Sequence, residues 1–161
     1  MGSQTGGIPT ATTIDHVAFT VPDLDQAVAF FTTVLGCVVL RRAGPNPTDR
    51  YVHPAGHLHL ALLRYDDHLK IELLAYTLPD GPAAPPAPPH QSDPGGTHLA
   101  FAVADLDAAL AYLRAQPMVR VLEAGYRPDG RGYAFFATPW GMELQLISYP
   151  AAASGGAPDR V

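Results

Sequence analysis

The spacing of apolar residues changes from a strand period to a helix period between residues 16 and 35. In "HVAFTV", residues 16–21, bulky apolar side chains alternate with small or polar ones, which predicts a β-strand with two unlike faces. Asp23 or Asp25 is placed to cap a following helix, and Gly36 to end it. The apolar residues of that helix recur at helical spacing: Ala27, Phe30, Phe31, Val34 and Leu35.

The same pattern occurs a second time. "HLAFAVADLDAALAYL", residues 98–113, is identical to "HVAFTVPDLDQAVAFF", residues 16–31, at nine of sixteen positions, and each copy starts with a histidine. The strand face with the histidine otherwise holds small residues, as expected of a sheet that lines a cavity. A second helix is predicted from about Asp105 to Pro117, packing Leu106, Leu110 and Leu113. A repeat of this length predicts two copies of one supersecondary unit.

Three strand-like runs follow each predicted helix, so both halves are predicted to be β-α-β-β-β, an α+β fold. They are "CVVLRRA", "HLHLALLRY" and "KIELLAY" in the first half, and "MVRVLEAGY", "RGYAFFATP" and "MELQLISY" in the second. "RRAGPNPTDRYVHPAG", residues 41–56, is rich in Gly and Pro and is predicted to be a loop over the mouth of a cavity.

Composition divides the chain into five segments. A flexible lead-in (1–12) precedes the first module (13–76), and a proline-rich linker (77–95) leads to the second module (96–149) and a flexible tail (150–161). The linker cannot form a helix or a central strand because of its prolines, so we expect an extended connector.

Charge and cysteine content exclude several classes of function. A net charge of −5 with no basic cluster argues against nucleic acid and against an anionic membrane surface. Cys37 is the single cysteine, so no internal disulfide forms. With no secretion signal recognisable in residues 1–13, these features predict a soluble, cytoplasmic domain.

A tandem β-α-β-β-β pair with a histidine near the start of each first strand resembles the vicinal-oxygen-chelate superfamily. This superfamily includes glyoxalase I, extradiol dioxygenases and bleomycin-binding proteins. The resemblance covers residues 13–149 and is most specific in "IDHVAFTV", "GTHLAFAV" and "TPWGMELQLISY". It implies a single domain of two modules whose curved mixed sheets form a cup-shaped cavity.

The resemblance also implies a metal site with ligands from the first and last strands of each module: His16, Glu72, His98 and Glu143. Both glutamates interrupt apolar strands, where a lone carboxylate would cost several kcal/mol of desolvation. Sharing one divalent cation removes that cost, and four protein ligands leave room for substrate in a six-coordinate shell. The ion is predicted to be Ni, Co, Zn, Mn or Fe.

Such an ion would act as a Lewis acid toward adjacent substrate oxygens. Glu72 and Glu143 are both candidate general bases, and Glu72 is preferred because extradiol relatives leave its position without a ligand. We therefore predict an isomerase, epimerase or lyase that acts by proton transfer on a small oxygenated substrate, with a role in bacterial specialised metabolism suggested by the Ala- and Pro-rich composition.

Two other functions fit the same resemblance. One is a ring-cleaving dioxygenase that binds iron through His16, His98 and Glu143, and the other is a metal-free antibiotic-binding protein. Methylmalonyl-CoA epimerases of this superfamily have a separate glutamate base in the first module, and residues 38–63 contain no glutamate, so a coenzyme A epimerase is disfavoured. A glutathione substrate is disfavoured because no basic cluster stands out to bind its carboxylates. A homodimer is expected. Weaker candidates for substrate contact are Tyr51, His57, His59, Tyr133 and Trp140.

Overall fold

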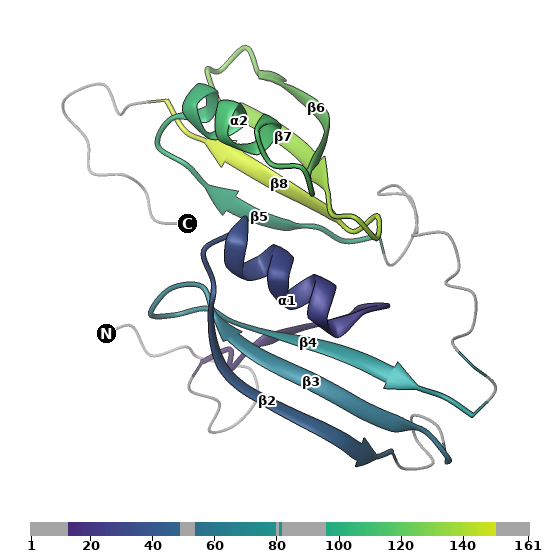
Figure 1. Cartoon of the computed structure of the whole chain (residues 1–161). Helices are drawn as coiled ribbons and strands as arrows, with labels where there is room; N and C mark the ends of the chain where they lie inside the picture. The colour runs from purple at the N-terminus through teal and green to yellow at the C-terminus, as the bar shows by residue number, and fades with distance from the viewer. Residues whose placement is uncertain (1–12, 49–53, 80, 82–95, 151–161) are drawn as a thin grey trace. The chain divides into compact units, whose positions relative to one another are not determined.

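The computed structural model describes residues 13–48, 54–79, 81 and 96–150. The chain divides into two compact units, Met1–Pro82 and Ala83–Val161, each with one four-stranded mixed sheet and one helix (Figure 1). The predicted α+β class and the two β-α-β-β-β repeats are confirmed. The predicted lead-in, nearly all of the tail and most of the linker lie outside the described residues.

The first unit consists of β1 (Val17–Thr20), α1 (Leu24–Thr33), β2 (Val38–Pro47), β3 (His57–Arg64) and β4 (Lys70–Thr77). The sheet order is β1-β4-β3-β2, with β1 parallel to β4 and the other neighbours antiparallel. The Asp23 carboxylate caps α1 by accepting a hydrogen bond from the Gln26 N–H at 2.9 Å. The helix buries the predicted apolar residues Ala27, Phe30 and Phe31.

Strand β2 extends further than the sequence indicated. The predicted loop was to begin at Arg41, yet β2 continues to Pro47 and pairs with β3 through two register shifts. Gly44 makes this pairing feasible: its φ is 111°, and a Cβ there would collide with the carbonyl oxygen of Leu58 in β3. Local Gly and Pro content predicted a loop, but the register shifts accommodate these residues within an edge strand.

The second unit repeats this topology with β5 (Leu99–Ala102), α2 (Leu106–Arg114), β6 (Arg120–Tyr126), β7 (Gly132–Ala137) and β8 (Glu143–Ser148). Its sheet order is β5-β8-β7-β6, and β5 is parallel to β8. Asp105 caps α2 by accepting from the Ala108 N–H at 3.0 Å. The helix buries the three predicted leucines, Leu106, Leu110 and Leu113.

Each helix covers one face of its own sheet, and that face holds the core of the unit (Figure 1). On β4, Ile71 and Leu73 are fully buried, whereas Glu72 between them points to the opposite face and is only partly buried. We call this second surface of each sheet its open face. The described helices include none long and apolar enough to cross a membrane.

Candidate functional site

The parallel pairing of β1 with β4 determines which side chains share the open face of the first unit. Ala18 pairs with Glu72, and Val17 pairs with Ile71 on the core face. His16 precedes Val17 and therefore lies on the same face as Ala18 and Glu72. The small Ala18 side chain leaves space next to the carboxylate.

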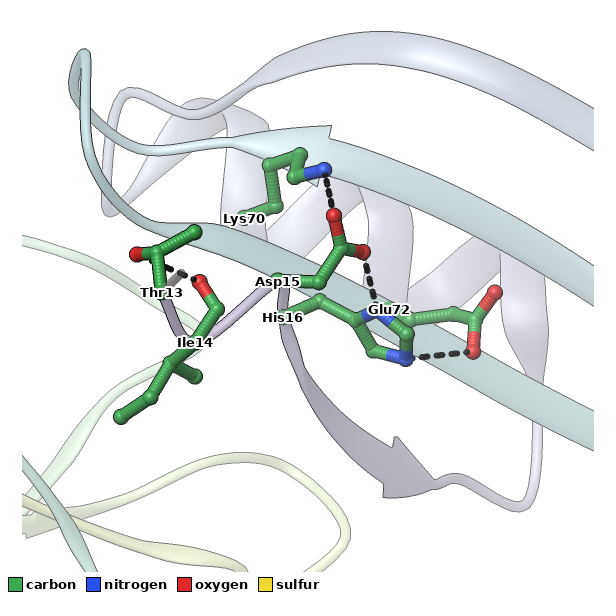
Figure 2. A network of polar contacts seen from close by, with 6 residues as sticks. All are labelled: Thr13, Ile14, Asp15, His16, Lys70 and Glu72. Carbon is green, nitrogen blue, oxygen red and sulfur yellow. Dashed lines mark hydrogen bonds and ion pairs between the residues drawn. The ribbon is translucent and has the colours of Figure 1, made fainter. Parts of the chain in front are cut away.

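His16 and Glu72, which the sequence predicted as ligands, are in contact (Figure 2). The Nε2 atom of His16 lies 3.4 Å from Oε2 of Glu72, and the two side chains are 37% and 18% exposed. Two ligands held about 2.0–2.2 Å from one divalent ion are themselves about 2.8–3.6 Å apart. The spacing of this nitrogen and this oxygen therefore fits a shared metal ion.

Asp15 and Lys70 extend this contact into a chain of four side chains. The Asp15 carboxylate accepts a hydrogen bond from Nδ1 of His16 at 2.7 Å and faces Nζ of Lys70 at 2.6 Å (Figure 2). These hydrogen bonds from His16 and Lys70 lower the pKa of Asp15 below its ordinary value. Since an ionised carboxylate only accepts hydrogen bonds, Nδ1 of His16 is the donor, and Nε2 faces Glu72.

The second unit has the same arrangement of strands. Ala100 of β5 pairs with Gln145 of β8, so His98, which precedes Leu99, lies on the open face with Gln145. The imidazole of His98 packs edge-on against Phe135 of β7, with ring centroids 5.5 Å apart. Among the described residues, no three His, Cys, Asp or Glu side chains form a metal-binding group.

The strand register changes the comparison between the two glutamates. Glu72 pairs with Ala18, and the residue that pairs with the matching Ala100 is Gln145, not Glu143. Glu143 precedes Leu144 as Lys70 precedes Ile71, so it corresponds to Lys70. It nevertheless shares the open face with Gln145, and its assignment as a ligand stays a prediction.

Sequence reasoning therefore missed Gln145. Aligning "IELLAY" with "LQLISY" would have found it, because Tyr76 then matches Tyr149. Glu143 was predicted instead because it is the one charged residue in "MELQLISY".

The weaker pocket candidates separate by face. His57 and His59 alternate with Ala61 and Leu63 and lie on the core face, whereas Leu62 pairs with Glu72 on the open face. The register therefore does not bring these two histidines to the face of Glu72. Nε2 of His59 lies 3.4 Å from Oγ1 of Thr77 instead.

Tyr133 lies on the open face of the second unit because it pairs with Ile147, two residues beyond Gln145. Its hydroxyl donates to Oε1 of Glu123 at 2.9 Å, and this contact raises its pKa. Trp140 is partly buried in the turn before β8, and Tyr51 lies outside the described residues.

Comparison with known proteins agrees with this architecture. The model of the glyoxalase/bleomycin resistance protein/dioxygenase superfamily matches residues 15–136. The chain belongs to this superfamily, as the paired modules and their first-strand histidines had indicated.

Among individual relatives, the chain is 46% identical over 158 residues to a 2-epi-5-epi-valiolone epimerase from an Actinomyces species, covering 91% of this chain and 85% of that protein. A glyoxalase family protein from Bacillus cereus superposes with a TM-score of 0.71 at 19% identity, covering 91% and 98% of the two chains. A fosfomycin resistance protein from Listeria monocytogenes, in complex with Mn(II) and 1S,2S-dihydroxypropylphosphonic acid, superposes with a TM-score of 0.58 at 14% identity. The match covers 85% of this chain and 90% of that protein. These two structures show that the fold is shared.

Proposed function

We propose that this chain is a metal-dependent epimerase that moves a proton at the carbon next to the carbonyl of a small polyhydroxylated cyclic ketone. The observation that carries the reaction type is the His16–Glu72 pair, a nitrogen and a carboxylate 3.4 Å apart on the open face of the first unit. The substrate class is suggested by the relative that is 46% identical over most of both chains.

The chemistry of 2-epi-5-epi-valiolone suits such a site. It is a cyclohexanone that carries several hydroxyl groups, and a C–H between its carbonyl and a hydroxyl is acidic. Removing that proton and returning one to the other face of the ring inverts a single carbon without breaking the ring. The carbonyl and the adjacent hydroxyl are vicinal oxygens, and a bound divalent ion would stabilise the negative charge that develops on the carbonyl oxygen.

In this proposal His16 and Glu72 of the first unit are metal ligands, and His98 with one β8 side chain are the equivalent ligand candidates of the second unit. Gln145 is our first choice on β8 because its register matches that of Glu72, and Glu143 is the alternative predicted from sequence. A glutamine donor carries no charge, so a bound ion would be a stronger Lewis acid than with a second carboxylate. A Mn(II) ion in the fosfomycin resistance protein supports a divalent cation in this fold.

Glu72 is the proposed general base. Its carboxylate takes the proton from the carbon, the C–H electron pair moves toward the carbonyl oxygen, and a proton is then returned to the opposite face of the ring. Glu143, on the same open face as Gln145, is the second acid–base candidate for that return.

The proposal is tested by incubating the Mn²⁺-loaded protein with 2-epi-5-epi-valiolone in D₂O without oxygen and following the ring protons by NMR. We expect a new epimer that carries solvent deuterium at one carbon next to the carbonyl, and no product from EDTA-treated protein. In a parallel incubation under air, ring cleavage that strictly requires O₂ would establish a dioxygenase instead. Tight binding without turnover would establish a binding protein.

A further inference from the structure

The contacts of His16 are asymmetric, and the asymmetry comes from residues that have no role in the proposed ligand set. One ring nitrogen, Nε2, faces Glu72 at 3.4 Å, while the other, Nδ1, is 2.7 Å from Oδ1 of Asp15. The second oxygen of Asp15 is 2.6 Å from Nζ of Lys70, which lies 55 residues away in sequence (Figure 2). Both carboxylate oxygens of Asp15 are thus engaged, one by the His16 ring and the other by the Lys70 ammonium group.

We propose that Asp15, held by Lys70, is a positioning residue that keeps His16 in the tautomer with its proton on Nδ1 and its Nε2 lone pair directed toward Glu72. This inference rests on the proposed function, in which Nε2 is a metal ligand. A carboxylate that accepts from Nδ1–H determines which nitrogen is free to bind a metal, orients the ring and raises its basicity.

The tautomer matters because Nε2 faces a carboxylate. With the proton on Nδ1, the lone pair of Nε2 and the Glu72 carboxylate face each other as two acceptors. Such an arrangement is unfavourable on its own and becomes favourable when a cation lies between them. Asp15 and Lys70 therefore hold the imidazole in the form that a metal ion requires before the ion arrives.

The Asp15–Lys70 pair has no counterpart in the second unit. At the matching places of the second unit, Thr97 precedes His98 and Glu143 precedes Leu144, so neither the aspartate nor the lysine is repeated. The Asp15–Lys70 pair therefore belongs to the first unit alone.

The first test measures the tautomer of His16 in the metal-free protein by long-range ¹H–¹⁵N NMR, at an alkaline pH where the ring signals of His16 no longer change with pH. We expect the proton on Nδ1 in the unmodified chain and a mixture of tautomers in Asp15→Ala. A proton on Nε2 in the unmodified chain would overturn the inference, whether or not the protein is an epimerase.

The second test is titration with Mn²⁺ alone, monitored by EPR. We expect Asp15→Ala to bind Mn²⁺ about 10- to 100-fold more weakly, and Lys70→Met up to about fivefold more weakly, as for loss of an exposed ion pair. Asp67→Ala is the matched control, because Asp67 pairs with Arg64 and is 90% exposed; its affinity should not change. Unchanged affinity in Asp15→Ala would refute the positioning role, whereas absence of Mn²⁺ binding by the unmodified chain would contradict the proposed function.

Discussion

Replacing Glu72 by Gln separates proton transfer from metal binding, because the second unit carries a glutamine at the equivalent place. Gln145 pairs with Ala100 as Glu72 pairs with Ala18, so an amide already occupies this register position once in the chain. The substituted side chain has the same size, and Glu72 is partly buried at 18% exposure, so we expect the fold to be retained. Glu72→Gln keeps an oxygen donor beside His16 but cannot accept a proton from carbon.

The expected effect is a fall in kcat of about 10²–10⁴-fold at saturating Mn²⁺, the usual contribution of a positioned general base. This fall corresponds to about 2.7–5.4 kcal/mol of transition-state stabilisation. The assay is deuterium incorporation from D₂O into 2-epi-5-epi-valiolone, with bound Mn²⁺ measured on the same samples.

Glu143→Gln makes the same chemical change on the open face of the other sheet and tests the second acid–base candidate in the same assay. A kcat of Glu72→Gln within about threefold of the unmodified value would show that Glu72 is not the base. A loss confined to Glu143→Gln would transfer the role to Glu143.

Three further predictions follow from the packing and the strand edges. Phe30→Ala should lower the free energy of unfolding of the first unit by about 3–5 kcal/mol in urea denaturation, because Phe30 is fully buried with its ring centroid 5.8 Å from that of Phe31. The repeat-equivalent Tyr112→Ala, at a position 46% exposed, should lower it far less. Burial raises the pKa of the Cys37 thiol to about 11, so iodoacetamide should label the folded chain slowly at about pH 8; fast labelling would contradict the burial of Cys37. The free energy of unfolding should fall as the pH rises from about 9 toward 11, because the thiol ionises first in the unfolded chain. Light scattering should give about twice the 17.1 kDa chain mass, because β2 is an edge strand with exposed Val38, Val39 and Leu40; a monomer mass at micromolar concentration would refute the expected dimer.

Local features of the chain were sufficient to predict the secondary structure. The two caps, Asp23 and Asp105, act through hydrogen bonds to residues three positions later, so their role is visible in a short stretch of sequence. The buried faces of both helices likewise follow from spacing within one helix. Strand β2 was the exception, because its pairing past Gly44 depends on β3, which lies more than ten residues further along the chain.

The site itself was only half determined by sequence. The repeat marked His16 and His98 as equivalent, because the first strand and helix are copied together with the same spacing. It did not mark the equivalent of Glu72, since the connections between the strands differ in length in the two halves and sequence offset no longer tracks strand register.

Tertiary structure decided what sequence could not, because contacts between strands depend on register rather than on distance along the chain. Pairing of β5 with β8 matched Gln145 to Glu72, and pairing of β3 with β4 placed His59 on the face opposite Glu72. Pairing of β1 with β4 likewise brought Lys70 next to Asp15, which lies 55 residues away in the sequence. A one-residue change of register moves a side chain to the other face of a sheet, so only the folded sheet shows which side chains meet.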